Sequence, residues 1–271
     1  MVSFPPCKIN LGLNIVGKRP DGFHDLATCF YPVPWTDMLE IVPAKRFSFA
    51  ASGTPVPGAA EDNLCVRAYE LLKGEFTLKP VAIHLHKIIP IGAGLGGGSA
   101  DGAYTLNILN ELFHLNLSVA RLREYAAILG SDCAFFIEGR PAIATGRGEV
   151  LADTSLSLKG KFLVIVKPEV HISTAEAFSE IVPRSPAHDL RTSLENQPIE
   201  SWKDVLRNDF EEYVFKQFPV IDAIHTKLYA LGASYASLSG SGSAVFGIFT
   251  DPVDLMQEFD SDLTYWSGHL D

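Results

Sequence analysis

A glycine-rich stretch at residues 90–101, PIGAGLGGGSAD, constrains the fold of this chain more than any other feature. It follows an alternating run at 81–87, which predicts a strand, and precedes a helical pattern at 99–113. Glycines let a ligand approach the backbone closely, and the first N–H groups of a helix attract anions. The stretch therefore predicts a phosphate-binding loop between a strand and a helix. A purely structural loop is the alternative.

Three familiar phosphate sites fit this loop poorly. Gly92, Gly94 and Gly97 match the dinucleotide pattern G-x-G-x-x-G, but that site needs a parallel βαβ unit with an acidic residue about 20 positions on. Here Ser118 begins a second helical pattern instead. A Walker A loop needs a lysine after the glycines, and a protein kinase needs an H-R-D loop; the sequence has neither. A different nucleotide-binding fold is indicated.

The remaining patterns predict a mixed α+β chain with two domains, at residues 1–153 and 154–271. Alternating or apolar runs predict strands at 8–16, 23–33, 38–42, 46–50 and 162–166, and on both sides of 239–242. Helical patterns occupy 61–74, 119–130, 204–218 and 219–231. The proline, serine and arginine content of 183–198 predicts a mobile surface segment.

Composition excludes several classes of partner. The chain has 22 basic and 32 acidic residues, a formal net charge of −10, and no dense run of Lys and Arg for nucleic acid. No apolar run reaches the roughly 18 residues that a membrane span needs. The cysteines lack C-x-x-C spacing, which predicts reduced thiols and a cytoplasmic protein: Cys7, Cys29, Cys65 and Cys133.

Separate stretches resemble one family in its expected order: KINL at 8–11, the loop at 90–100 and SGSGS at 239–243. This family is the GHMP kinases, named for galactokinase, homoserine kinase, mevalonate kinase and phosphomevalonate kinase. RPDGFH at 19–24 and NDFE at 208–211 are most similar to the members that phosphorylate a cytidine diphosphate-linked polyol for non-mevalonate isoprenoid synthesis. The resemblance implies a ribosomal-protein-S5-like N-terminal domain, which binds ATP and carries the catalytic residues, and a ferredoxin-like C-terminal domain, which binds substrate.

The resemblance also implies two catalytic residues. Asp132, in GSDCAFF at 130–136, matches the catalytic aspartate of the family, and Cys133-Ala134 replace its more frequent Val-Pro. Lys8 lies on the polar face of the first predicted strand and would stabilise developing negative charge. A helix-capping Asp132 and a solvated Lys8 are the structural alternatives.

The remaining candidate residues bind the two substrates. The loop is expected to hold ATP through Pro90, Gly92, Gly94, Leu95, Gly96, Gly97, Gly98 and Ser99. The cytidine-linked substrate is expected to contact Asn10, Phe23, His24, Phe178, Ser239, Gly240, Ser241 and Gly242. Phe23 replaces a tyrosine of the family, so stacking is kept and the hydroxyl is lost. Phe178 is equally well explained as a core residue.

Other assignments stay open at this point. Mg²⁺ is expected with ATP, with Ser99 as one candidate ligand and the full metal-ligand set unknown. His84 and His86 share a strand face, but lack a third metal ligand and are interpreted as structural. The alternatives in function are a GHMP kinase for homoserine, mevalonate or a sugar, and a non-catalytic nucleotide-binding regulator. A monomer or homodimer is expected.

Overall fold

The computed structural model describes residues 1–270, which divide into two compact units. Unit 1 comprises 1–8, 35–91 and 96–140, and unit 2 comprises 9–34, 92–95 and the chain from 141 onward. The predicted α+β class is confirmed by the sheets and helices of both units. The predicted domain boundary at 153/154 directly follows strand β8 (Val150–Asp153). The units are interleaved along the chain, however, because long strands near the N-terminus contribute to both.

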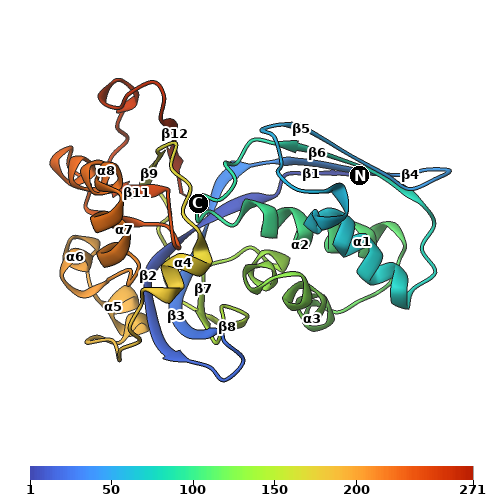
Figure 1. The fold of residues 1–271 in the computed structure, drawn as a ribbon, viewed down its shortest axis with the longest axis horizontal. Helices are drawn as coiled ribbons and strands as arrows, with labels where there is room; N and C mark the ends of the chain where they lie inside the picture. Colours follow the sequence, from blue (N-terminus) through green and yellow to red (C-terminus); the bar gives the residue numbers. More distant parts are fainter. Residues whose placement is uncertain (271) are drawn as a thin grey trace. The chain divides into compact units, whose positions relative to one another are not determined.

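Unit 1 packs helices on one face of a sheet (Figure 1). The sheet order is β1 (Val2–Ser3), β4 (Met38–Pro43), β6 (Val81–Lys87) and β5 (Ser48–Gly53), with only β5 and β6 parallel. Alternation in β6 buries Val81, Ile83 and Leu85 against the helices and exposes His84. The helical elements are η1 (Ala60–Asp62), α1 (Leu64–Glu75), α2 (Gly97–Leu112), α3 (Val119–Leu129) and η2 (Ser131–Ile137).

Helix starts in unit 1 follow the capping residues of the sequence. Ser118 Oγ accepts the N–H of Arg121 at 3.2 Å, which confirms the predicted cap of α3. Asn63 Oδ1 accepts the N–H of Cys65 at the start of α1. Helix α2 begins at Gly97, slightly before the predicted residue 99, so two glycines belong to its first turn.

Unit 2 contains two antiparallel sheets. One has the order β2 (Pro6–Lys18), β3 (His24–Thr36), β7 (Ala142–Thr145) and β8; the first residues of β2 and the last of β3 belong to unit 1. The other has the order β10 (Tyr235–Leu238), β11 (Val245–Phe249), β9 (Phe162–Lys167) and β12 (Thr264–His269). Its order, second, third, first and fourth along the chain, is that of a ferredoxin-like sheet and agrees with the prediction.

A core that includes Val164, Ile221, Leu228 and Val245 lies between the second sheet and helices of unit 2 (Figure 1). The helices of this unit are α4 (Thr174–Ser179), α5 (Leu190–Asn196), α6 (Trp202–Val205), α7 (Glu211–Gln217) and α8 (Pro219–Ala230). Two short 3₁₀ turns, η3 (Ile199–Ser201) and η4 (Met256–Glu258), complete the unit.

Two sequence predictions for unit 2 are wrong. The helix predicted at 204–218 is broken at 206–210, because Leu13 of β2 donates its N–H to Arg207 O and accepts that of Asp209, both at 2.8 Å. The surface segment predicted at 183–198 contains α5, which buries Leu190 and Leu194. Asp189 caps this helix by accepting the N–H of Thr192.

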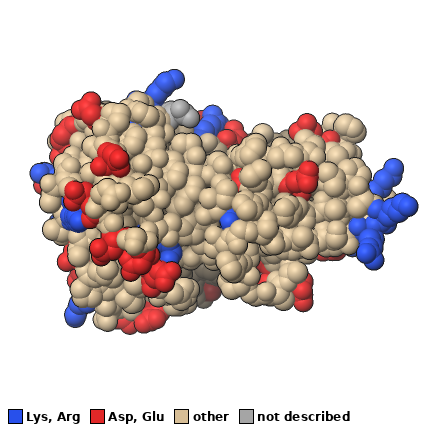
Figure 2. Space-filling view, turned by 90° about the horizontal axis from the view of Figure 1, so that it is seen from above, with Lys and Arg blue, Asp and Glu red and all other residues tan. Residues whose placement is uncertain are grey.

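Figure 2 shows acidic side chains spread over the face drawn, with basic side chains placed singly across it and in one small group at the right of the view. This distribution accords with the net charge of −10. Among residues 1–270, no helix is long and apolar enough to cross a bilayer.

Candidate functional site

The glycine-rich loop joins β6 to α2, as predicted, and requires glycine at specific positions. Gly92, Gly94 and Gly96 have φ values of 67°, 75° and 70°, in the left-handed region. A Cβ on Gly94 would lie 1.8 Å from the carbonyl oxygen of Ser239. Gly98 differs, because it is exposed and a Cβ there would meet nothing within 4 Å. The loop is therefore tightly constrained at Gly94 and open at Gly98.

The open end of the loop carries backbone donors. The first helical hydrogen bond of α2 runs from Ala100 N to Gly96 O, so the N–H groups of Gly97, Gly98 and Ser99 have no acceptor within the helix. Such groups, together with the positive end of the helix dipole, favour an anion. The arrangement agrees with the predicted phosphate site, while the binding itself stays a prediction.

Lys8 and Asp132 lie together in unit 1. Lys8 Nζ is 3.5 Å from Asp132 Oδ2, with side-chain exposures of 3% and 32%. Burial lowers the pKa of the Lys8 ammonium, and the neighbouring Asp132 charge partly opposes that shift. The structure thus excludes the solvated alternative for Lys8 and places a partly exposed carboxylate beside a buried cation.

This pair adjoins the part of the loop that belongs to unit 1. A Cβ on Gly96 would lie 3.2 Å from Lys8 Cε and 3.1 Å from the ring of Phe136. Ser99 lies near the Cys133 thiol, and burial raises the pKa of that thiol to about 12. Loop, cation and carboxylate are therefore neighbours, and their chemistry suits transfer of a negatively charged group to an acceptor whose proton the carboxylate takes.

Of the aromatic residues predicted to bind the cytosine ring, only some lie together, and these are in unit 2. The rings of His24 and Phe178 stack at 5.1 Å with an interplanar angle of 17°, and Phe210 contacts the edge of Phe178. Burial lowers the pKa of His24, and Lys18 adds to that shift. Phe23 does not join this stack: it is 52% exposed, and Arg147 lies over its ring at 4.8 Å.

Asn10 is held on the polar side of β2 within unit 2. Its Nδ2 donates to Thr28 Oγ1 at 3.0 Å, and Thr28 in turn donates to Gly12 O. Asn10 Oδ1 is 3.6 Å from the position that a Cβ on Gly240 would occupy. The structure therefore brings Asn10 next to the predicted serine–glycine turn.

That turn at 239–243 is braced by buried hydrogen bonds. Ser239 Oγ donates to Gly94 O at 2.9 Å, and Ser243 Oγ donates to Val170 O at 2.8 Å. Ser241 Oγ lies 3.2 Å from Thr174 Oγ1 and is 9% exposed, whereas Ser239 is fully buried. The Ser239 hydroxyl thus holds the glycine-rich loop. Substrate contacts of this turn stay a prediction.

Several residues of this region were missed by sequence reasoning. Arg147 and Thr174 contact predicted binding residues but occur in no recognisable pattern, and only proximity in the fold reveals them. The sequence singled out Asn208 as part of the NDFE stretch at 208–211, but it did not indicate the structural role of this residue. Its Nδ2 donates to Leu238 O and Gly240 O, both at 2.8 Å.

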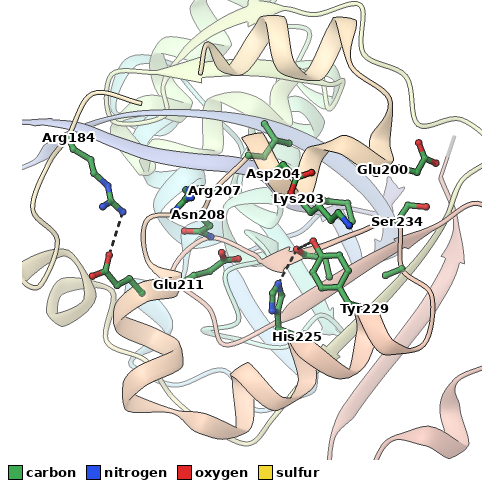
Figure 3. A pocket seen from close by; sticks show the side chains of 15 residues that line it. Arg184, Glu200, Lys203, Asp204, Arg207, Asn208, Glu211, His225, Tyr229 and Ser234 are labelled. Carbon is green, nitrogen blue, oxygen red and sulfur yellow. Dashed lines mark hydrogen bonds and ion pairs between the residues drawn. The ribbon is translucent and has the colours of Figure 1, made fainter. Parts of the chain in front are cut away.

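A pocket of about 980 Å³ lies elsewhere in unit 2. Figure 3 shows Arg184, Lys203, Arg207, His225 and Tyr229 around it. Some of its polar groups are engaged: Arg184 pairs with Glu212, and His225 and Tyr229 both reach Ala236 O. None of the site residues predicted for substrate, ATP or catalysis lines it among residues 1–270. It is a recess beside the edge strand β10.

The side chains beside the glycine-rich loop provide part of a set of oxygen ligands for Mg²⁺. Within residues 1–270 no cluster of three or more His, Cys, Asp or Glu side chains has metal-binding geometry. Mg²⁺ usually keeps several waters and uses one or two protein oxygens together with substrate phosphates. The Asp132 carboxylate and the Ser99 hydroxyl beside Cys133 supply oxygens of that kind.

Comparison with known proteins places these features in a family. The chain matches the GHMP kinases N terminal domain at residues 63–140 and the GHMP kinases C terminal domain at 190–259. It is 51% identical to a 4-diphosphocytidyl-2-C-methyl-D-erythritol kinase of Bacteroides fragilis, covering 98% of this chain and 97% of that one. It is 47% identical to the Cytophaga hutchinsonii enzyme of that name, covering 97% of each.

Solved structures agree with this result. A crystal structure of 4-(cytidine 5'-diphospho)-2C-methyl-D-erythritol kinase matches with a TM-score of 0.82 and 31% identity, covering 100% of this chain and 99% of the other. A homoserine kinase from Cytophaga hutchinsonii matches with a TM-score of 0.71 at 17% identity, covering 99% and 94%. The second match shows a shared fold alone.

Proposed function

The chain belongs to the GHMP kinases, and we propose that it phosphorylates the 2-hydroxyl of 4-diphosphocytidyl-2-C-methyl-D-erythritol with ATP. The product would feed non-mevalonate isoprenoid synthesis. The single observation that carries the proposal is the Lys8–Asp132 pair beside Gly96, where a phosphate loop, a buried cation and a carboxylate meet. The choice of substrate is supported by relatives of nearly equal length that are named as kinases of this compound.

In the proposed reaction, Asp132 accepts the proton of the substrate hydroxyl as its oxygen bonds to the γ-phosphorus of ATP. The bond from that phosphorus to the bridging oxygen breaks, and ADP leaves with the electron pair. Lys8, buried and adjacent, stabilises the charge that develops on the transferred group. The N–H groups of Gly97–Ser99 hold the phosphates.

Binding of the cytidine part is assigned to unit 2. His24 presents ring nitrogens to the base edge, and its stack on Phe178 fixes the ring plane. Phe23, which is exposed beneath Arg147, supplies a second aromatic surface for the cytidine part. Asn10 and the turn at 239–242 are assigned to the polyol diphosphate.

The cofactor is Mg-ATP in this proposal, and Ser99 and Asp132 would hold the metal together with the phosphates. Bound Mg²⁺ would neutralise phosphate charge. The four buried thiols and the absence of a membrane-spanning helix in residues 1–270 support a cytoplasmic location.

Release of ADP from Mg-ATP tests the proposal, with CDP-methylerythritol, mevalonate, homoserine and a sugar as acceptors. The wild type should turn over CDP-methylerythritol fastest. Asp132→Asn should lower kcat by about 10²- to 10⁴-fold, because loss of a positioned base costs that much. The exposed Asp262→Asn is the control and should keep the wild-type rate.

The outcomes separate the alternatives. Faster turnover of another acceptor would reassign the substrate within the family. ATP binding without turnover of any acceptor would favour the non-catalytic regulator. Unchanged kcat in Asp132→Asn would reject Asp132 as the base.

A further inference from the structure

An arginine that the proposed reaction does not use lies over the ring of Phe23. Arg147 Cζ is 4.8 Å from the ring centroid, and both residues belong to unit 2. A guanidinium at this distance is attracted by the electron-rich face of an aromatic ring. Phe23 is nevertheless 52% exposed. The ring therefore has a cation on one side and is still accessible to a ligand.

The backbone that carries Phe23 is fixed by the turn at 19–23, which joins β2 to β3. Phe23 donates its N–H to Asp21 Oδ1 at 3.1 Å and accepts the N–H of Arg19 at 2.8 Å. The Arg19 side chain pairs with Asp21 and Asp25 at 3.1 and 3.0 Å. These bonds hold the main chain of the turn and do not reach the ring of Phe23. The orientation of the ring therefore depends on its side-chain contacts.

Arg147 is held from the other side by the turn at 146–149, which joins β7 to β8. Glu149 Oε2 accepts the backbone N–H of Arg147 at 2.6 Å, and Glu149 Oε1 is 3.9 Å from Arg147 Nε. Gly146 O accepts the N–H of Leu26 at 2.7 Å, and β3 pairs with β7 (Figure 1). The guanidinium is therefore anchored to the sheet independently of the ring that it covers.

This support matters because of the residue that the chain has at position 23. Phe23 replaces a tyrosine of the family, so its ring has no hydroxyl that a hydrogen bond could fix. Ordering an exposed side chain when a ligand binds costs conformational entropy. A guanidinium already packed on the ring restricts it before the ligand arrives, which lowers that cost.

We propose that Arg147 is a positioning residue for the cytidine part of the substrate: its guanidinium covers one face of Phe23 and holds the ring so that the cytosine stacks on the other face. The inference rests on the proposed function in taking a cytidine diphosphate compound as the ligand. Arg147 itself touches neither the cytosine nor a phosphate in this proposal.

Calorimetric titration with cytidine diphosphate (CDP) tests this role without requiring turnover. Arg147→Met removes the guanidinium and keeps an unbranched side chain, so the dissociation constant for CDP should rise about three- to tenfold. Arg147→Lys keeps the charge without the planar group and should give an intermediate value. Both variants should bind Mg-ATP as the wild type does. Arg46→Met, the matched control, removes an exposed arginine of unit 1 and should leave both affinities unchanged.

A double-mutant cycle separates positioning from direct contact with the ligand. Phe23→Ala alone should weaken CDP binding about tenfold, since stacking of a base on an aromatic side chain contributes that much. Adding Arg147→Met to Phe23→Ala should change the dissociation constant by less than about twofold, because Arg147 then has no ring to hold. Circular dichroism verifies that each variant is folded. The Arg147 side chain is 30% exposed, and Phe23 is more exposed still.

Steady-state kinetics provide a second readout. Arg147→Met should raise KM for CDP-methylerythritol about three- to tenfold and leave kcat within about twofold, because Lys8 and Asp132 are unchanged and only binding is lost. A general disturbance of the structure would lower kcat as well.

Wild-type affinity for CDP in Arg147→Met would overturn the proposal. So would additive effects in the double variant, because Arg147 would then contact the ligand directly, and so would an equal loss of affinity for Mg-ATP. A wild type that does not bind CDP would overturn both this role and the proposed substrate. If CDP binds as described but no acceptor is phosphorylated, the positioning role stands and the proposed function alone fails.

Discussion

At the scale of single residues, glycines that look alike in sequence have different reasons to be present. Gly94 and Gly98 both lie in the loop, yet only Gly94 has a left-handed φ and a backbone oxygen in the space of a Cβ. Gly98 lies in the first turn of α2 with open space around it. The first glycine is needed by the fold, whereas the space around the second would also admit a side chain.

Gly94→Ala should therefore lower the free energy of unfolding by about 3 kcal/mol or more, because left-handed strain and a clash with Ser239 O add together. Gly98→Ala is the matched control and should leave stability unchanged or raise it by up to about 1 kcal/mol. Urea unfolding followed by circular dichroism measures both. A Gly94→Ala protein as stable as Gly98→Ala would contradict this account of the loop.

Lys8 and Asp132 could be named as candidates from the sequence, whereas a buried cluster of three charged side chains could not. Lys8 and Asp132 follow from a family resemblance, and their ion pair agrees with it. Asp37, Lys87 and Asp101 are separated along the chain, and a charged residue in a strand or helix usually indicates an exposed face. Nothing in a single sequence indicates that all three are buried together.

At the scale of elements, strands and caps were predicted more reliably than helix continuity. Alternation identified β2, β4 and β6, and Ser118 identified the start of α3. The helical pattern over 204–218 failed because tertiary pairing with Leu13 is stronger than local propensity there. Asn208 stabilises the break, since its amide donates to two carbonyl oxygens of the neighbouring segment.

Asn208→Ala should lower the free energy of unfolding by about 2–4 kcal/mol, because Leu238 O and Gly240 O lose a buried donor. Gln217→Ala, on the exposed end of α7, should change stability by less than about 0.5 kcal/mol. Thermal and urea unfolding measure the difference. Equal stability of the two variants would show that the break at 206–210 does not depend on Asn208.

At the scale of the whole molecule, the class of fold could be predicted, whereas the domain boundary at 153/154 stays a prediction. The order of strands and helices indicated α+β, and the resemblance indicated a ferredoxin-like sheet, which the strand order of β9–β12 matches. A boundary inferred from the order of strands and helices divides the chain once and places each residue on one side of it. It cannot reveal that β2 and β3 contribute to both units.

The stability of the whole protein should depend on pH through Asp101. Its pKa in the folded protein, about 7, is above the ordinary 3.8. The folded chain therefore binds more protons between these values, and the free energy of unfolding falls as pH rises from about 4 to about 7. Between about pH 5 and about pH 8, the free energy of unfolding of the wild type should fall by about 2–3 kcal/mol more than that of Asp101→Asn.

Urea unfolding of both proteins across that range measures the difference, and groups common to both cancel. Glu111→Gln removes an exposed acid from α2, serves as the control and should follow the wild-type curve. Parallel curves for wild type and Asp101→Asn would show that Asp101 is already ionised in the folded protein at low pH.

The crossing of the chain between units inside the glycine-rich loop, after Leu95, has a consequence for biosynthesis. Every segment of unit 1 has left the ribosome once residue 140 emerges, whereas unit 2 still lacks its larger part. The early hairpin of β2 and β3 must then wait for partners that are translated much later. Residues 92–95 of the loop wait with it, because Gly94 packs against Ser239 of the turn at 239–243, which is translated much later.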